Sequence, residues 1–480
     1  MAVSSLRPPR GGDEIGVSAT GRFLEDEQVL KRFPFRPGQD LLIGAIVNDR
    51  TAQYVGVPID DRHGFTVAGS RAGKGASFII PNLRLYPGSI LANDPKGELA
   101  RETAQYRLAL GQDVAILDPF GETDFPCDSF NPLDIINPES DEAMDEAALI
   151  ADALIIQESD KNKHFTESAR NFIQGIVLYV ATSSQAHERT CGHVRSLLSL
   201  PVFDMAEPGG LFDRMRALGG FAKEAADAFA SKHEEEQSSV LSTAQEQTTF
   251  LSSPAIRRAL GPSSFSMDDL KTSKRGLTVY IVLPARRLAT HSRFLRLMIN
   301  VGLSRLEAVP NFPTAGRTAN GAPVLFMLDE FSALGHMTVL ERAAGLMAGF
   351  GCKMHIILQD LTQIKRLYKE SWETFLGNSG IMNFFGNVDQ TTCDYVSKLS
   401  GEVETVQLNI RETDETEREV KRLEGWSQNM VIKPLLDPAE VRRYFARERN
   451  TQLVIIPGNF PIAVKRVAYF DKAHAKLFRT

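Results

Sequence analysis

The sequence predicts an α/β protein in which a mainly parallel sheet is interrupted by an all-helical insertion. Short apolar runs alternate with helix-like segments in both outer parts of the chain, as in βα units whose strands are buried on both faces. Between residues 139 and 262 these runs give way to helical periodicity. The length of 480 residues allows about two to four domains, or one large domain that carries an insertion.

Each expected element follows from a run of this kind. Before the insertion, strands are expected at 41–46, 64–68, 89–92 and 113–117. Within it, helices are expected at 143–157, 165–182, 211–230 and 234–251, with caps or breakers at Ser140, Pro201 and Pro254. After it, strands are expected at 277–283, 324–328, 353–358, 380–385, 451–456 and 463–469, with helices at 289–309 and 339–350.

These patterns divide the chain into three parts. Residues 1–40 lack a clear period and indicate a tail and connector. Residues 41–138 and 263–480 are expected to form one discontinuous sheet domain, and residues 139–262 an inserted all-α domain. The charge-dense stretch 402–425 indicates a solvated loop or an exposed ribbon.

Composition indicates a soluble chain in a reducing compartment. Apolar residues make up 43% and charged residues 24%, and the four cysteines are scattered without a CxxC pair. The longest apolar runs are about one strand long, well short of the roughly 20 residues that cross a bilayer. The N-terminus has no signal-peptide core, so a cytosolic chain without a membrane span is expected. With a net charge of -6, any nucleic-acid binding would need a local basic lining.

A glycine-lysine loop follows the expected strand 64–68 and opens into an apolar helix. In such a loop, successive backbone N–H groups and the helix N-terminus form an anion cradle. The lysine, here Lys74, reaches the β- and γ-phosphates of a nucleotide. The residues expected to surround the phosphates are Gly69, Ser70, Arg71, Ala72, Gly73, Lys74, Gly75, Ala76 and Ser77.

This loop departs from the usual pattern at two positions. Ala68 stands at the first glycine position, with Gly69 one residue later. Gly75 stands where a magnesium-binding hydroxyl is usual, and Ser77, the nearest hydroxyl, lies two residues further along. The alternative interpretation is an ordinary strand–helix turn with a surface lysine.

Two adjacent carboxylates, Asp329 and Glu330, follow the buried strand expected at 324–328. Ligands of doubly wound sheets bind at the carboxyl ends of strands. Strand alternation would send the two side chains to opposite sides and give them different roles. Asp329 would hold a magnesium ion, directly or through water, and Glu330 would polarise the attacking water. The alternative is an acidic helix N-cap after a core strand.

Gln359 ends the next expected strand, 353–358. If that strand neighbours the carboxylate strand, the Gln359 amide can sense the γ-phosphate and report it to residues 361–368. The alternative is a polar strand terminus without a role. Together with the glycine-lysine loop, these residues favour nucleotide hydrolysis with Lys74, Asp329, Glu330 and Gln359 as the catalytic residues.

The chain resembles the type IV coupling proteins, the TraG/VirD family of conjugative and effector secretion, from about residue 50 to 470. The matching segments are 69–75, Asp94-Pro95-Lys96-Gly97-Glu98, Phe130-Asn131-Pro132, Asp329-Glu330-Phe331, Leu334-Gly335, Gln359 with Gln363, 434–441 and 458–462. The family's phosphate loop commonly has glycine after the glycine-lysine pair, as Gly75 is here.

The resemblance implies a RecA-like, P-loop ATPase domain with an inserted all-helical domain. It also implies ATP and Mg²⁺ as cofactors, homo-hexameric rings with ATP at subunit interfaces, and cargo that passes through a central channel. The cargo would be relaxase-bound single-stranded DNA or effector proteins, handed to the inner-membrane components of a type IV secretion system. Most members carry an N-terminal membrane anchor of two helices, which the sequence as given does not show. Either the anchor has been removed, or the chain is expected to be a naturally soluble member that needs a partner to reach the cytoplasmic face of the inner membrane.

Two other classes of function compete with a translocating ATPase. One is a nucleotide-binding platform that docks cargo with little turnover, and the other is a soluble DNA-segregation or packaging motor. The cation that a neighbouring subunit usually supplies could be Arg342, Lys353 or Arg366. His187, Cys191 and His193 lie close together in a helical region, but no second cluster accompanies them, and zinc is not expected.

Overall fold

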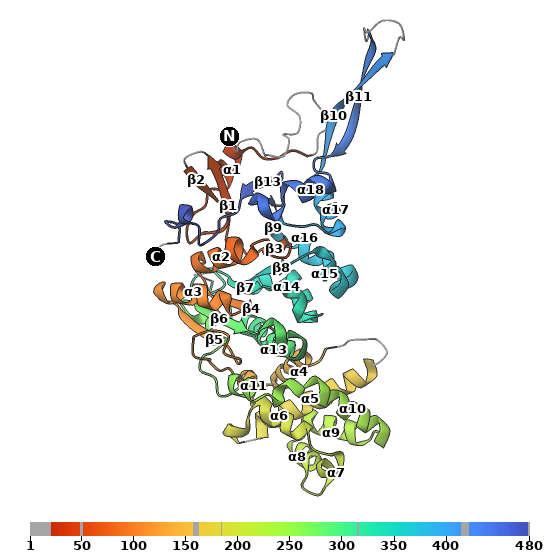
Figure 1. Ribbon diagram of the computed structural model, residues 1–480. Coiled ribbons are helices and arrows are strands. Elements are labelled where there is room, and N and C mark those ends of the chain that lie inside the picture. The colour runs from red at the N-terminus through yellow and green to blue at the C-terminus, as the bar shows by residue number, and fades with distance from the viewer. Residues whose placement is uncertain are drawn as a thin grey trace.

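One eleven-stranded sheet runs through the body of the molecule (Figure 1). The computed structural model of the protein describes residues 21–48, 51–156, 163–183, 185–313, 316–413 and 422–478. In sheet order the strands are β2 (Thr51–Pro58), β1 (Asp40–Asn48), β13 (Ile462–Lys465), β12 (Thr451–Ile455), β9 (Ser379–Phe385), β3 (His63–Ala68), β8 (Cys352–Leu358), β7 (Val324–Leu328), β4 (Ile90–Asp94), β6 (Leu277–Val282) and β5 (Asp113–Leu117). The strands from β9 to β5 are parallel, and those from β12 to β2 extend the sheet in antiparallel fashion.

Helices cover both faces of the parallel part and form a separate module. They are α1 (Asp26–Arg32), α2 (Ile80–Leu85), α3 (Glu98–Ala109), α4 (Ala143–Leu154), α5 (Lys163–Ser183), α6 (Cys191–Leu198), α7 (Val202–Ala206), α8 (Leu211–Leu218), α9 (Gly220–Ala230), α10 (Glu234–Gln247), α11 (Pro254–Ala259), α12 (Asp269–Thr272), α13 (Ala285–Ala308), α14 (Thr338–Leu346), α15 (Leu361–Tyr368), α16 (Trp372–Gly377), α17 (Gln390–Leu399) and α18 (Pro438–Tyr444). None of the described helices is both long enough and apolar enough to cross a membrane.

The central strands read as continuous apolar runs because both faces of the sheet are buried. In β7, Leu325 and Met327 belong to the core cluster that includes residues of α2 and α3. Phe326 and Leu328 belong to the cluster that includes residues of α13 and α14. Alternate residues of one strand therefore hold the two helical layers against the sheet, and the strand ends are fixed between them.

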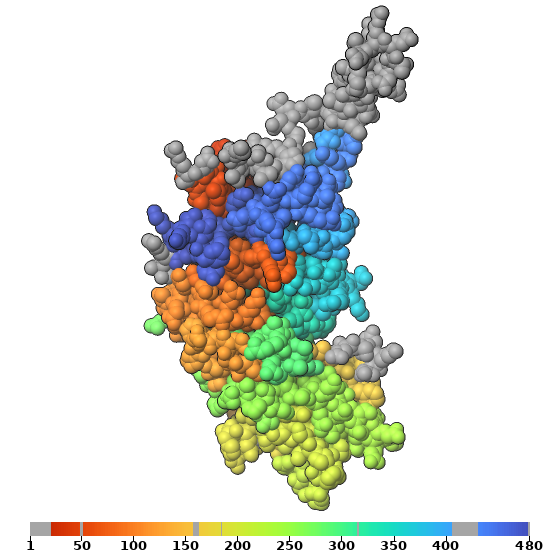
Figure 2. Space-filling view, viewed as in Figure 1, coloured from red at the N-terminus to blue at the C-terminus, as the bar shows by residue number. Residues whose placement is uncertain are grey.

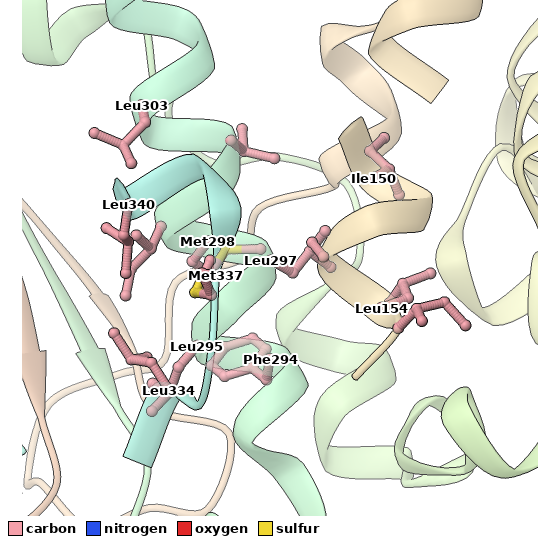
Figure 3. Packing of buried hydrophobic residues seen from close by; sticks show 14 of the residues in the cluster. Ile150, Leu154, Phe294, Leu295, Leu297, Met298, Leu303, Leu334, Met337 and Leu340 are labelled. Carbon is pink, nitrogen blue, oxygen red and sulfur yellow. The ribbon is translucent and has the colours of Figure 1, made fainter. Parts of the chain in front are cut away.

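Helices α4 to α11 form the module at the lower end of Figures 1 and 2. The described residues between 139 and 262 contain no strand. Phe172 of α5 stacks on Phe229 of α9 at 4.1 Å between ring centroids, inside the core of this module. Ile150 and Leu154 of α4 lie opposite Leu297 of α13 (Figure 3), so the module and the sheet domain share one hydrophobic cluster.

Several sequence predictions need correction at their edges. All the predicted strands are present, but β13 ends at Lys465 instead of Tyr469, and β2 was missed. The helix expected at 211–230 is broken into α8 and α9 at Gly219 and Gly220, both of which have positive φ. Helix α1 lies in the stretch expected to be a connector, whose residues 1–20 fall outside the described part. The fold class is confirmed, and the domain boundaries at 138/139 and 262/263 stay a prediction.

The charge-dense stretch contains a two-stranded antiparallel ribbon, β10 (Glu402–Thr413) and β11 (Arg422–Pro434). It projects from the end of the molecule opposite the helical module (Figure 1). Of the two structures predicted for this stretch, the ribbon is therefore the one that forms.

Candidate functional site

The glycine-lysine loop joins β3 to a helical turn at the carboxyl edge of the sheet. The Ser77 N–H donates to the Gly73 carbonyl at 2.9 Å, and the N–H groups of Lys74, Gly75 and Ala76 precede that first helical hydrogen bond. Gly73 has a φ of 91°, which favours glycine. A Cβ at Gly75 would meet no atom within 4 Å. The loop therefore directs several unsatisfied donors toward open space, as an anion cradle requires.

Gly69 explains the displaced first glycine. A Cβ at this position would lie 1.9 Å from the Gly386 carbonyl oxygen, so no side chain fits. The Gly69 N–H donates to the Phe385 carbonyl at 3.1 Å. Ala68 lies within β3 and is fully buried. The close approach of backbone to backbone thus occurs one residue later than the usual pattern places it.

Asp329 and Glu330 both contact the ammonium group of Lys74. Lys74 Nζ lies 2.7 Å from Asp329 Oδ1 and 2.8 Å from Glu330 Oε1. The expectation that strand alternation sends the two carboxylates to opposite sides is wrong. β7 ends at Leu328, and Glu330 adopts a φ of 49°, which turns its side chain back toward the lysine. A left-handed non-glycine residue is strained, and such residues cluster at functional sites.

Gln359 joins the same cluster from the neighbouring strand. β8 pairs with β7 in parallel, as the prediction for Gln359 requires. Gln359 Nε2 donates to Glu330 Oε2 at 3.3 Å. Its backbone N–H donates to Gln363 Oε1 at 3.0 Å, so the strand end is also tied to α15. The structure therefore brings together all four side chains that the sequence proposed as catalytic.

Burial and charge oppose each other in this cluster. Burial acts to lower the pKa of Lys74, but the two carboxylates raise it above its usual value. Burial raises the pKa of Asp329 despite the lysine. Burial acts in the same direction on Glu330, which is more exposed, and there the Lys74 ammonium and the Gln359 amide hold the pKa below its usual range. The site thus keeps a cation beside two acids whose pKa values are shifted in opposite directions.

A cavity of about 380 Å³ opens beside the cluster. Of the predicted residues, those that line it are Ser70, Arg71, Gly73, Lys74, Gly75, Ala76, Asp329, Glu330 and Gln359. Gly69, Ala72 and Ser77 do not line it. Ser77 Oγ donates to the Gly73 carbonyl at 2.8 Å, so this hydroxyl fixes the loop from within.

The connection from β4 to α3 supplies lining residues that the site prediction missed. They are Asp94, Pro95, Lys96, Glu98 and Leu99. Asp94 Oδ2 accepts a hydrogen bond from the Ala100 N–H at 2.9 Å, and burial raises the pKa of Asp94 to about 6. The sequence did contain a sign of Asp94, because this acid is the last residue of a buried strand, and Asp329 directly follows one. Without the strand order, which places β4 beside β7, the two ends could not be joined.

The three cations considered for a neighbouring subunit's site differ in availability. Lys353 is 2% exposed and donates to Asp60 Oδ1 at 3.2 Å, near the amino end of β8 and away from the cavity. It cannot reach another chain without unfolding that edge. Arg342 forms an ion pair with Glu307 at 2.7 Å, and Arg366 is exposed on α15. Arg342 and Arg366 stay candidates.

A parallel sheet covered on both faces, with a glycine-lysine loop and an acidic strand end at one edge, defines the class of P-loop NTPase folds. The family described as "Type IV secretory system Conjugative DNA transfer" matches residues 24–479. The chain belongs to this family.

Relatives and solved structures agree with that assignment. The conjugal transfer protein TraG of Agrobacterium fabrum is 27% identical over 99% of this chain and 70% of its own length. VirD4 of the same organism is 28% identical over 87% of this chain and 60% of its own length, so the chain spans about 60–70% of these relatives. The conjugative coupling protein TrwBdeltaN70 superposes with a TM-score of 0.68 at 15% identity, with 98% of this chain and 99% of that one covered. This likeness shows the shared fold.

Proposed function

We propose that the chain binds and hydrolyses ATP in the cavity beside Lys74 and uses the energy to move conjugative cargo. The observation that carries the proposal is the contact of one lysine with two acids on the wall of a cavity at the carboxyl edge of the sheet. TrwB has been solved with a non-hydrolysable ATP analogue and with ADP and Mg²⁺. Because that protein has the same fold, its complexes support a nucleotide at the corresponding edge here.

Each residue of the cluster has a separate task in this mechanism. The phosphates of ATP lie along the part of the loop from Ser70 to Ala76 that lines the cavity, and their charge draws the Lys74 ammonium away from the carboxylates. Glu330, released from the lysine, accepts a hydrogen bond from the attacking water and polarises it. The Gln359 amide, which donates to Glu330, reports the γ-phosphate to α15. These roles are the ones that the sequence predicted.

The donor set at the strand ends fits a magnesium ion. Magnesium in nucleotide sites is usually held by one or two carboxylates together with phosphates and water. Asp329 would be its protein ligand, and Asp94 lines the same cavity with a pKa raised by burial and by Asp329. A cation there would relieve that repulsion. When bound, the ion would neutralise charge on the β- and γ-phosphates.

We further propose the setting that the family implies. The chain would act as a homo-hexamer at the cytoplasmic face of the inner membrane, beside the components of a type IV secretion channel. It would receive relaxase-bound single-stranded DNA or effector proteins. The helical module of α4 to α11, projecting from the sheet domain, would meet that cargo first.

Phosphate release by the purified full chain tests the proposal. ATP turnover should rise with single-stranded DNA and disappear in Lys74→Ala. Lys232→Ala is the matched control, because Lys232 pairs with Glu236 at 2.5 Å in the helical module, away from the cavity. Unchanged turnover in Lys74→Ala would overturn the proposal.

The same measurements separate the competing functions. A docking platform would bind ATP and release no phosphate with DNA and secretion partners present. A segregation or packaging motor would prefer double-stranded DNA. The mass of the protein in solution should be determined alongside, because a site completed at a subunit interface is active only in the assembled ring.

A further inference from the structure

The chain segment after β13 passes behind the glycine-lysine loop and contacts it through Arg466. This side chain is buried, at 6% exposed, and does not line the cavity. Its Nη1 donates to the Ala72 carbonyl, and its Nη2 donates to the Arg447 carbonyl at 2.5 Å. The guanidinium also lies 4.9 Å from the centroid of the Phe385 ring, at the end of β9. Arg466 therefore joins the back of the loop to two neighbouring elements.

The hydrogen bond to Ala72 sets the direction of the next backbone donor. In a trans peptide unit the C=O and N–H groups point in opposite directions. With the Ala72 carbonyl held toward Arg466, the Gly73 N–H points away from Arg466, and Gly73 lines the cavity on the other side. Arg466 thus orients the Gly73 N–H toward the cavity from the opposite side of the loop.

Without such a contact, the orientation of this peptide would be poorly determined. Gly73 has no Cβ to oppose rotation of the peptide that precedes it. Arg71, two residues earlier, has a φ of 57°, so the loop already contains a strained residue. The Ala72 N–H donates to the Gly69 carbonyl at 3.0 Å. That bond holds the peptide before Ala72 and does not fix the peptide between Ala72 and Gly73.

The segment after β13 also forms a hydrogen bond with the start of the helix that follows the loop. The Tyr469 N–H donates to the Ala76 carbonyl at 3.0 Å. In a regular α-helix the Ile80 N–H would take that carbonyl, but it donates to Gly75 instead. The result is a π turn over Gly75–Ile79. Residues 466–469 therefore contact the phosphate loop at two points, the carbonyls of Ala72 and Ala76.

Burial of Arg466 has a cost. Its Nε is buried without a hydrogen-bond partner among the described residues. A buried unpaired donor is destabilising, so the bonds from the two terminal nitrogens to the Ala72 and Arg447 carbonyls have to offset it. We propose that Arg466 is a positioning residue for nucleotide binding, which aims the Gly73 N–H at the phosphate chain by holding the Ala72 carbonyl. The inference rests on the proposed function, because it assumes that a nucleotide binds at this loop.

The experiment compares Arg466→Met, Arg466→Lys and the control Arg195→Met. Arg195 is half-buried in the helical module and, like Arg466, donates to a main-chain carbonyl, that of Gln245, at 2.7 Å. Binding of ATP, ADP and inorganic pyrophosphate is measured by calorimetry on the full chain. The KM for ATP and kcat are measured in the presence of single-stranded DNA.

Loss of one charge-assisted hydrogen bond should weaken binding of all three ligands in Arg466→Met by about 10- to 100-fold. The loss of affinity should be the same for ATP, ADP and pyrophosphate, because the Gly73 N–H faces the part of the phosphate chain that all three ligands share. KM should rise by a similar factor while kcat stays within about twofold, the sign of an interaction made equally before and during reaction. Arg466→Lys, which keeps a cation and one donor, should recover part of the affinity, and Arg195→Met should bind normally.

Three results would overturn the inference. One is unchanged affinity in both Arg466 variants while the wild type binds ATP. Another is a fall in kcat at constant KM, which would indicate a smaller folded fraction. The third is an equal loss of affinity in Arg195→Met. If Arg466→Met does not fold, the rise in KM with kcat retained must appear in Arg466→Lys. A wild-type chain that binds none of the three ligands would instead overturn the proposed function, and this inference with it.

Discussion

Replacing Lys74 with methionine should destabilise the nucleotide-free protein in addition to abolishing ATP binding. The Lys74 ammonium is the counter-charge of two carboxylates whose side chains are 11% and 24% exposed, at 2.7 and 2.8 Å. Removing one partner of a buried pair costs about 3–5 kcal/mol. Because Glu330 retains contact with solvent, we expect the lower end, about 3 kcal/mol of unfolding free energy.

Urea unfolding at two pH values provides the assay. With the lysine gone, both carboxyl groups should have pKa values above those of the unfolded chain, so the folded variant binds protons that the unfolded chain does not. Its stability should therefore recover as the pH falls from 7.5 toward 5. The double variant Lys74→Met/Glu330→Gln, which also removes one of the two charges, should regain about half of the loss. Lys232→Met should cost less, because its partner Glu236 is 30% exposed, against 11% and 24% for Asp329 and Glu330. A loss below that of Lys232→Met, or one independent of pH, would refute the electrostatic account of the cluster.

Three further perturbations test neighbouring features. Glu330→Gln should keep ATP affinity within a few-fold but lower phosphate release by about 10²–10⁴-fold, and equal losses of binding and turnover would contradict its role with the water. Asp94 has a folded pKa of about 6, against about 3.9 unfolded, so the nucleotide-free protein should lose about 3 kcal/mol as the pH rises through that window. Asp94→Asn should lack this loss in urea titrations between pH 4 and 7, and an unchanged pH profile would show that Asp94 is not its origin. Arg296→Met should lower the unfolding free energy by about 2 kcal/mol or more, because it leaves buried carbonyls unsatisfied. A melting temperature within about 1 °C of wild type would contradict this.

The strand ends that carry the site were predictable, but the strand order that brings Asp94 to Asp329 and the backbone strain at Glu330 were not. Apolar runs followed by a glycine-lysine loop or an acidic pair identify strand ends, and parallel strands bring those ends to one edge. The left-handed conformation of Glu330 has no sequence signal, since a glutamate is rare there. Strand β2 was missed because its first half is partly exposed and polar, and its pairing with β1 stabilises it. Local propensity alone does not report that pairing.

The loop behind the acidic pair shows how the site is tied to the helical module. Arg296 of α13 donates to the carbonyls of Leu334 and His336, both at 2.8 Å, just beyond Glu330. Its other nitrogens donate to the Ile155 and Ala153 carbonyls at the end of α4, at 3.1 and 3.3 Å. Leu334 and Met337 also pack beside α13, which faces α4 (Figure 3).

One guanidinium, 4% exposed, thus connects the segment after the carboxylates to the first helix of the module. A displacement of residues 334–336 would either carry the Arg296 side chain with it or break these buried hydrogen bonds. Breaking them is unfavourable, because buried carbonyls would lose a charged donor. We therefore expect a shift of this segment to displace the end of α4 as well, and we expect Arg296→Lys, with fewer donors, to weaken that coupling while leaving the cavity residues unchanged.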